Sequence, residues 1–389
     1  MGVSEFVTVG VIVGFAVSIV VSLGLVLTTR WHGKYSLDQL VGIQKFHAVP
    51  TPRIGGLAIF AGLVCACLVA AEERRAILAP ILVAGLPAFC FGVAEDVTKR
   101  VSVRARLLAT MASGIFAWYL TGASVTNTGV WGVDSALGIL PISVIFTAFA
   151  VSGVANAVNI IDGFNGLASG SVMIALAALG LIALNAGDTN LALVCFIVCG
   201  VTLGFFLLNF PFGKLFLGDG GAYLLGFILA WLAVMLPARN PSVSAWAPFL
   251  VCGYPVFETV FTIIRRVLAK ADPGQPDGNH LHTLIKVKIC MRIFRRVTAS
   301  LRNASVSPFS WAVAAVPAVL AVQFSTNTAA LMVACLASFL FYVGIYLLLA
   351  NIPAVEHVAP SATAQVVEFQ PGQVLSVVAN VDDDVAQAA

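Results

Sequence analysis

Eleven long apolar ranges constrain what this chain can fold into. A helix of about 20 apolar residues crosses the bilayer core, and its backbone groups are hydrogen-bonded within the segment. We therefore predict an all-α, polytopic membrane helix bundle of about eleven transmembrane helices. Only 10% of the 389 residues are charged, against about a quarter in soluble domains. The apolar ranges are 6–28, 54–71, 77–94, 106–121, 136–155, 167–186, 190–209, 220–237, 245–263, 309–325 and 328–350.

The basic residues predict the orientation of the bundle. Eighteen of the 21 Lys and Arg residues follow odd-numbered ranges, and only Arg74, Arg75 and Arg239 follow even-numbered ones. The positive-inside rule then places the N-terminus outside and the C-terminus in the cytoplasm. The net charge of +3 reports this topology, so we expect no nucleic-acid partner. Residues 351–389 contain no Lys or Arg, and we expect a disordered acidic tail after a membrane domain over 1–350.

The most informative stretch is 155–168, which interrupts two apolar ranges with Asn156, Asn159, Asp162 and Asn165. The turn signals Asp-Gly and Asn-Gly mark the end of the helix there. No Lys or Arg lies in this stretch, so topology does not account for its polarity. Polar side chains at membrane depth usually face a cavity, an ion or a partner, which makes this stretch a predicted binding site.

Two further clusters leave alternatives open. His47 and Arg53 lie in a loop that suits a phosphate-rich ligand, although a capped loop with a topological arginine is an equal interpretation. Glu95 and Asp96 end a helix, where paired carboxylates hold a divalent cation or take a proton. Taken alone, an acidic pair beside Lys99 and Arg100 favours a solvated salt-bridge patch.

Two clusters follow later in the chain. Asp219 stands between glycines at a predicted helix start, where backbone amides bind phosphate and the carboxylate takes a metal, or where it simply caps the helix. His280 and His282 are two residues apart and point the same way only in an extended segment. They suit phosphate binding or proton transfer, or are surface histidines.

All five clusters follow odd-numbered ranges, so the topology places them on the cytoplasmic face. Carboxylates, amides, basic residues and histidines at one membrane surface suit a soluble phosphorylated substrate, a magnesium ion and a lipid acceptor. A transporter more often carries charges in mid-helix and shows two related halves. The sequence shows no such repeat.

With these motifs the chain resembles the polyprenyl-phosphate N-acetylhexosamine-1-phosphate transferases, which form glycosyltransferase family 4. That family includes UDP-GlcNAc:undecaprenyl-phosphate GlcNAc-1-phosphate transferases and the phospho-MurNAc-pentapeptide translocase. The matching motifs are residues 52–56 (PRIGG), 95–96 (ED), 156–167 (NAVNIIDGFNGL), 217–219 (LGD) and 280–282 (HLH).

The resemblance implies a magnesium-dependent enzyme of the bacterial inner membrane, with manganese as an alternative ion. It would transfer a sugar 1-phosphate from a UDP-sugar to undecaprenyl phosphate and release UMP, beginning an O antigen, capsule or exopolysaccharide. A homodimer is common among such proteins. The alternatives are the peptidoglycan translocase and a membrane transporter without catalysis.

The resemblance also assigns roles to matching positions. Asp219 is the expected magnesium ligand, assisted by Asn159. Glu95 and Asp96 are expected to engage or deprotonate the acceptor phosphate. The remaining predicted substrate-binding residues are His47, Arg53, Asn156, Asp162, Asn165, His280 and His282, of which Asp162 and Asn165 would contact the uridine and the histidines the sugar or diphosphate.

Three departures from the family pattern matter. Glu95 replaces the first Asp of the usual pair, and Asn165 stands where many relatives have Asp. The His-Leu-His segment lacks the longer histidine run of the translocase. The short histidine segment favours the hexosamine branch of the family.

Overall fold

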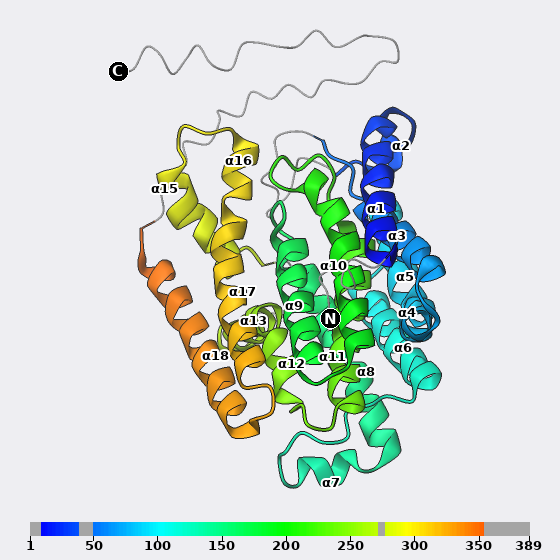
Figure 1. The fold of residues 1–389 in the computed structure, drawn as a ribbon. Coiled ribbons are helices and arrows are strands. Elements are labelled where there is room, and N and C mark those ends of the chain that lie inside the picture. The colour runs from blue at the N-terminus through cyan, green and yellow to red at the C-terminus, as the bar shows by residue number, and fades with distance from the viewer. Residues whose placement is uncertain (1–8, 39–49, 271–276, 354–389) are drawn as a thin grey trace, which may run out of the picture. The chain divides into compact units, whose positions relative to one another are not determined.

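The computed structural model describes residues 9–38, 50–270 and 277–353, and every regular element within these ranges is a helix (Figure 1). The chain divides into two units, 1–354 and 355–389, and the described residues all belong to the first. His47 and residues 354–389 of the predicted tail lie outside the described residues. The prediction of an all-α membrane protein is confirmed.

Seven helical segments of the described chain are long and apolar enough to cross a membrane. They are α1 (Val9–Leu27), α8 (Leu140–Ile160), α9 (Leu167–Asn185), α10 (Thr189–Asn209), α11 (Gly218–Arg239), Ala299–Gln323, which comprises α16 (Ala299–Ala304) and α17 (Val306–Gln323), and α18 (Thr328–Asn351). An eighth is the pair α4 (Glu72–Ala84) and α5 (Leu86–Thr98), which bends by 48° at Gly85.

The other apolar ranges also fall on helices, one of them short, one less apolar and one broken. The range 54–71 forms α3 (Gly55–Val69), 106–121 lies in α6 (Val103–Thr121), and 245–263 divides at Cys252 into α12 (Trp246–Val251) and α13 (Gly253–Leu268). Each of the eleven predicted ranges thus corresponds to a helix or a broken pair. The number that crosses the membrane and the orientation of the bundle stay predictions.

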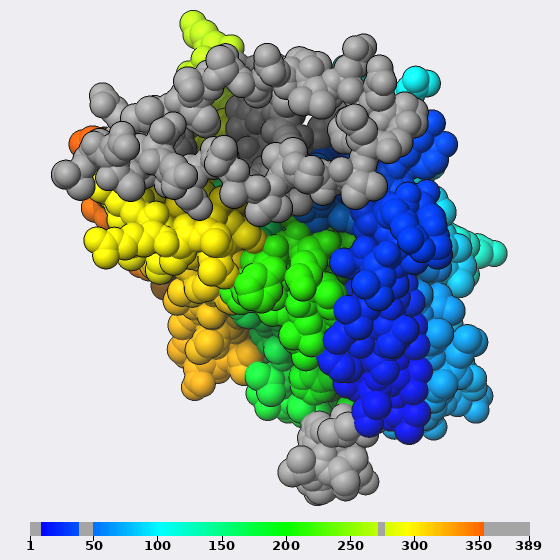
Figure 2. Space-filling view, turned by 90° about the horizontal axis from the view of Figure 1, so that it is seen from above, coloured from blue at the N-terminus to red at the C-terminus, as the bar shows by residue number. Residues whose placement is uncertain are grey.

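The remaining elements are short helices at the ends of the bundle. They are α2 (Thr29–Ser36), α7 (Val133–Leu137), α14 (Leu281–Leu284), the π-helical turn Ile285–Cys290 and α15 (Met291–Ile293). In Figure 2 the green surface of the middle of the chain lies between the blue N-terminal helices and the yellow helices α16 and α17. This agrees with the packing of α10 against α1 and of α9 against α17.

Helix α11 is the centre of the bundle. It packs against α3, α5, α8 and α9, and most of its residues are buried. Two of its aromatic side chains, Phe227 and Trp231, stack on one another with ring centroids 6.3 Å apart. Because other helices surround α11, the residues of its first turn are also enclosed, at one end of the bundle. The side chain of Asp219, in its first turn, is therefore shielded from both lipid and water.

Glycines let two helices approach the first turn of α11. A Cβ atom at Gly56 of α3 would lie 2.4 Å from the backbone N of Gly221. One at Gly92 of α5 would lie 2.6 Å from the Cα of Gly220. These contacts are backbone to backbone, so no side chain can move away to make room. The pairs fix the spacing of α3 and α5 around Asp219.

This packing predicts that Gly92→Ala destabilises the protein. Ala is the better helix former by about 1 kcal/mol, but overpacking against a backbone costs about 1–3 kcal/mol. Gly153→Ala in α8 is the matched control, because no heavy atom lies within 4 Å of its added Cβ. Heating in detergent followed by size-exclusion chromatography should show a lower midpoint for Gly92→Ala alone. Equal midpoints for the two variants would contradict the close packing.

Candidate active site

Asp219 is the centre of a polar cluster formed by four separate segments. Its side chain is 3% exposed and forms ion pairs with Arg53, from the segment before α3, and with Arg106, from the first turn of α6. Asn159, near the end of α8, donates its Nδ2 to Oδ1 of Asp219 over 3.2 Å. The cluster lies at the N-terminus of α11, where the helix dipole favours negative charge. Arg53, Asn159 and Asp219 are thus brought together.

Asp96 holds the N-terminus of α11 from the neighbouring helix α5. Its Oδ1 accepts the backbone N–H of Asp219 and its Oδ2 that of Gly220, both over 2.8 Å. Arg53 Nε lies 3.4 Å from the same carboxylate, which is almost completely buried. Asp96 therefore acts as a helix cap supplied by another helix. Its expected role toward the acceptor phosphate stays a prediction.

Glu95 is directed elsewhere than Asp96. It is half-buried, and its Oε2 accepts the backbone N–H of Val101 over 2.8 Å, which holds the turn between α5 and α6. Among the described residues, neither carboxylate of this pair forms an ion pair with Lys99 or Arg100. Asp96 does not belong to a solvated salt-bridge patch, because it is buried against α11. The catalytic role of Glu95 stays a prediction.

Arg106 is a site residue that the sequence interpretation missed. Besides its ion pair with Asp219, its guanidinium lies 5.9 Å from the ring centroid of Tyr223. In the sequence, Arg106 counts only as one of the basic residues that set topology. Nothing in its spacing distinguishes it from Arg104, which is exposed. The only available signal was a basic residue at the first position of a predicted apolar range.

The loop between α8 and α9 lies beside this cluster. Asp162, in the loop, is half-buried. Burial raises the pKa of Asp162 to about 7, and the neighbouring carboxylates of Asp219 and Asp96 add to the rise against the opposing charge of Arg53. The carboxyl groups and Arg53 are therefore close enough to form one electrostatic unit.

Asn156 and Asn165 use their amides within the protein. Asn156 donates to the carbonyl of Ser152 over 2.8 Å, on the face of α8 that meets α6. Asn165 is buried and donates to the carbonyl of Pro211 over 2.9 Å. Its own carbonyl accepts from Ser307 Oγ of α17 over 2.6 Å. These bonds hold the loop in place, and the substrate contacts expected of both residues stay predictions.

The histidine segment lies against the same loop, more than a hundred residues away in sequence. The ring of His282 meets Phe164 edge-on at a centroid distance of 5.7 Å. An added Cβ at Gly163 would lie 3.2 Å from His282 Nε2. His280 Nδ1 lies 3.0 Å from Glu258 Oε1 of α13. The structure thus brings His282 to the 160–166 loop.

Glu258 is the second residue that sequence interpretation did not place in the site. It is completely buried and contacts the histidine segment through His280 and the backbone N–H of Leu281. A signal for it did exist, because an ionisable residue inside an apolar range is costly and marks a functional position.

The oxygen donors of the cluster suit a magnesium ion that also binds substrate. Among the described residues, no group of three or more His, Cys, Asp or Glu side chains is arranged to hold a metal. Magnesium does not require such a cage, because it commonly binds one or two carboxylates together with waters and substrate phosphates. Asp219 supplies a carboxylate. Asn159 supplies an amide oxygen, which accepts from the Tyr223 hydroxyl over 3.3 Å and would exchange that partner for the ion after a half-turn of the amide group. The residues present therefore fit that ion.

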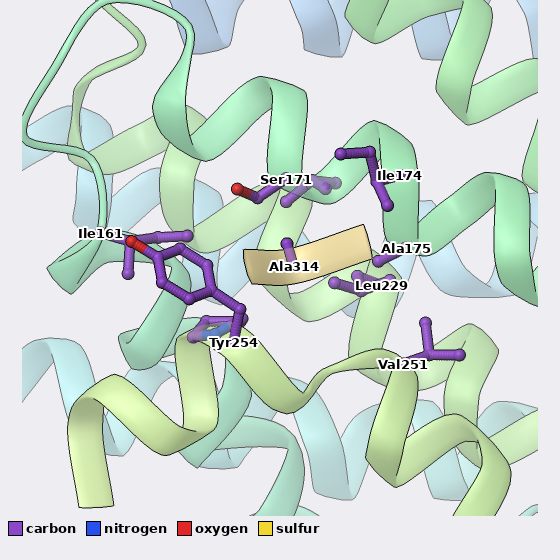
Figure 3. Close-up of a pocket in the computed structure, with 10 residues that line it drawn as sticks. Ile161, Ser171, Ile174, Ala175, Leu229, Val251, Tyr254 and Ala314 are labelled. Carbon is purple, nitrogen blue, oxygen red and sulfur yellow. The ribbon is translucent and has the colours of Figure 1, made fainter. Parts of the chain in front are cut away.

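Two cavities lined by described residues lie away from this cluster. The cavity in Figure 3 lies between Ile161, Ser171 and Tyr254 and measures only about 10 Å³, room for about one water. A second cavity of about 400 Å³ is lined by residues 124–129, 237–238 and 241–245, among others. Its lining includes none of the predicted site residues.

Comparison with known proteins gives consistent matches. A model of glycosyl transferase family 4 matches residues 78–237. The probable undecaprenyl-phosphate N-acetylglucosaminyl 1-phosphate transferase of Bacillus subtilis is 30% identical over 61% of this chain and 66% of its own length. The undecaprenyl-phosphate alpha-N-acetylglucosaminyl 1-phosphate transferase of Yersinia pestis is 28% identical over 65% and 70%. The decaprenyl-phosphate N-acetylglucosaminephosphotransferase of Mycobacterium tuberculosis is 32% identical over 61% and 65%.

The similarity covers about two thirds of each relative, 65% to 70% of its length. The stretch matched by the family model includes Asp96, Arg106, Asn159, Asp162 and Asp219. Arg53 and the histidine segment lie outside that stretch.

Proposed function

The chain belongs to glycosyl transferase family 4, and we propose on that basis that it transfers a sugar 1-phosphate from a UDP-sugar to a polyprenyl phosphate with release of UMP. The observation that carries this proposal is the cluster around Asp219. Arg53, Arg106 and Asn159 reach this carboxylate from three other segments. Carboxylate, amide and guanidinium groups together are what a diphosphate and its counter-ion require.

Phosphoryl transfer mainly requires alignment and neutralisation of charge. Arg53 and Arg106 supply two positive charges at the N-terminus of α11, and both guanidinium groups are partly exposed, at 29% and 16%. They can therefore reach phosphate oxygens as well as Asp219. Asp96 fixes the first turn of α11 through two backbone bonds, which keeps the Asp219 carboxylate directed at the cluster.

The proposed cofactor is Mg²⁺, with Mn²⁺ as a substitute. Asp219 and Asn159 would hold the ion, and a bound ion would neutralise charge on the diphosphate of the donor. Asp162, beside this group, would contact the uridine part of the donor. Glu95 or Asp96 would engage the acceptor phosphate.

The proposed acceptor is undecaprenyl phosphate and the proposed transferred group N-acetylglucosamine 1-phosphate, because the names of the relatives give both. UDP as the carrier of that sugar is what the resemblance to the family implies. The site would face the cytoplasm of a bacterial inner membrane, as the distribution of Lys and Arg predicts. The peptidoglycan translocase is a weaker alternative, since its longer histidine run is missing from residues 280–282. A transporter without catalysis would not need the buried charge cluster at one end of the bundle.

A direct test measures UMP release. The purified protein in nanodiscs would be given UDP-N-acetylglucosamine, undecaprenyl phosphate and Mg²⁺, with each component omitted in turn. We expect UMP only in the complete mixture, in equal amount to an extractable lipid-linked sugar. No UMP with any UDP-hexosamine would contradict the proposed function.

The position of Arg106 predicts a strong effect of Arg106→Ala. A charge-assisted hydrogen bond contributes about 1.5–3 kcal/mol, so kcat/KM should fall about tenfold to a hundredfold. Arg104→Ala is the matched control, because Arg104 belongs to the same helix but is exposed. Equal activity of the two variants in the UMP assay would remove Arg106 from the site.

A further inference from the structure

Glu258 is a buried carboxylate that faces two histidines. Its side chain is 0% exposed, and in the described part of the chain it forms no ion pair with Lys or Arg. Its Oε1 accepts the backbone N–H of Leu281 over 3.1 Å and lies 3.0 Å from His280 Nδ1. A buried carboxylate is costly unless such partners satisfy it. Glu258 therefore ties α13 to the histidine segment.

The second carboxylate oxygen faces His282. Glu258 Oε2 and His282 Nδ1 lie 3.9 Å apart, and neither has a hydrogen-bond partner within the described residues. The rings of His280 and His282 stack, with centroids 5.1 Å apart and planes 13° apart. The hydroxyl of Tyr342 is another polar group near this carboxylate. A shift of less than 1 Å would bring Oε2 and Nδ1 into hydrogen-bond distance.

This arrangement determines which histidine nitrogen carries the proton. A carboxylate accepts only, so Nδ1 of His280, 3.0 Å from Glu258 Oε1, carries the hydrogen between them. For His282 the facing carboxylate oxygen Oε2, at 3.9 Å, favours the same tautomer, with the hydrogen on Nδ1. In a neutral ring the Nε2 atom is then bare and accepts hydrogen bonds. Burial lowers the pKa of His282 to about 4, which agrees with a neutral ring at neutral pH. Its Nε2 faces Gly163 in the 160–166 loop.

An unprotonated Nε2 can accept a hydrogen bond from some groups of a nucleotide sugar but not from others. A diphosphate has only acceptor oxygens and would meet this nitrogen unfavourably, whereas sugar hydroxyl and acetamido N–H groups donate. We propose that Glu258 is a positioning residue that fixes the orientation and tautomer of His280 and His282, so that His282 Nε2 accepts a hydrogen bond from the sugar of the donor. This inference rests on the proposed function, because it specifies the part of the donor that the histidine segment contacts.

Glu258→Gln tests the inference without changing the size of the side chain. The Gln oxygen still accepts from Leu281 and His280, but its amide N–H₂ faces His282 Nδ1 and reverses the tautomer of that ring. We expect the KM for UDP-N-acetylglucosamine to rise about tenfold to a hundredfold, by analogy with the loss found when the hydrogen-bond partner of a metal-bound histidine is removed. The inhibition constant of UDP, which has the diphosphate but no sugar, should stay within about twofold of the wild-type value.

Two kinetic outcomes would overturn the inference. An unchanged KM would mean that Glu258 does not act through the donor. An equal rise in the inhibition constant of UDP would mean that the histidines contact the diphosphate. Thr262→Val is the matched control, because Thr262 Oγ1 lies near the same His280 nitrogen but at 3.4 Å. Its KM should match that of the wild type.

A spectroscopic measurement separates this inference from the proposed function. The chain has five histidines, so ¹⁵N-histidine NMR in nanodiscs resolves few signals, and His280→Gln and His282→Gln assign them. We expect the Nδ1 of His282 to be protonated in the wild type and bare in Glu258→Gln. A wild-type His282 protonated at Nε2 would overturn the inference. Absence of transfer by the wild-type protein would instead contradict the proposed function alone.

Discussion

Asp219→Ala is expected to abolish sugar 1-phosphate transfer while the protein stays inserted in the membrane. The substitution removes the one carboxylate that contacts Arg53, Arg106 and Asn159 together. Removing a single preorganised charge-stabilising group costs about a hundredfold to a thousandfold, and the proposed metal site is lost as well. We therefore expect a fall in kcat/KM of about a thousandfold or more.

The fold should survive this substitution. Breaking a fully buried ion pair costs about 3–5 kcal/mol, but both guanidinium groups remain partly exposed, and hydration reduces that cost. Size-exclusion chromatography and the UMP assay should be run on Asp219→Ala, Asp219→Asn and Asp188→Ala. Asp188 pairs with Arg239 and caps α10, away from the cluster, and should not affect transfer. Retention of more than a tenth of the activity by Asp219→Ala would remove Asp219 from the centre of the site.

Removal of divalent cations is expected to have an effect of similar size. Magnesium binds a diphosphate and carboxylate or amide oxygens, and in the proposed site Asp219 and Asn159 would provide the protein oxygens. Treatment with EDTA should reduce transfer to the background of the assay. Added Mg²⁺, and to a lesser extent Mn²⁺, should restore it.

The control for this experiment is Ca²⁺, which prefers more ligands and longer bonds than magnesium. It should restore little activity. Full transfer in EDTA would contradict the proposed metal site, and it would require Arg53 and Arg106 to neutralise the diphosphate without an ion.

Much of the fold follows from the apolar ranges, because a helix is the only way to satisfy backbone groups across a bilayer without a closed barrel. Length and hydropathy do not reveal where a range breaks. Gly85 bends α4 against α5, and Cys252 separates α12 from α13, although both positions are apolar or small. The first break does carry a local signal, because Pro87 in the first turn of α5 has no backbone N–H to donate to a continuing helix.

The site shows the same division. Arg53, Asn159 and Asp219 are predicted as site residues from the sequence, and the structure brings these three into contact. Asp162, also predicted, lies in the adjoining loop. The sequence did not reveal that Asp96 caps α11, because that contact joins residues 123 positions apart. Nor did it separate Arg106 from the basic residues that set topology. The path of α6 past the first turn of α11 is what distinguishes that arginine.

The most direct test of the central claim determines whether the β-phosphate of the donor is transferred to the lipid together with the sugar. UDP-N-acetylglucosamine labelled with ³²P at the β-phosphate and ³H in the uridine would be incubated with the protein, undecaprenyl phosphate and Mg²⁺. We predict that ³²P enters the lipid extract together with the sugar, while ³H leaves as UMP. Recovery of the sugar in the lipid without ³²P, or of ³H as UDP, would contradict transfer of a sugar 1-phosphate at this site.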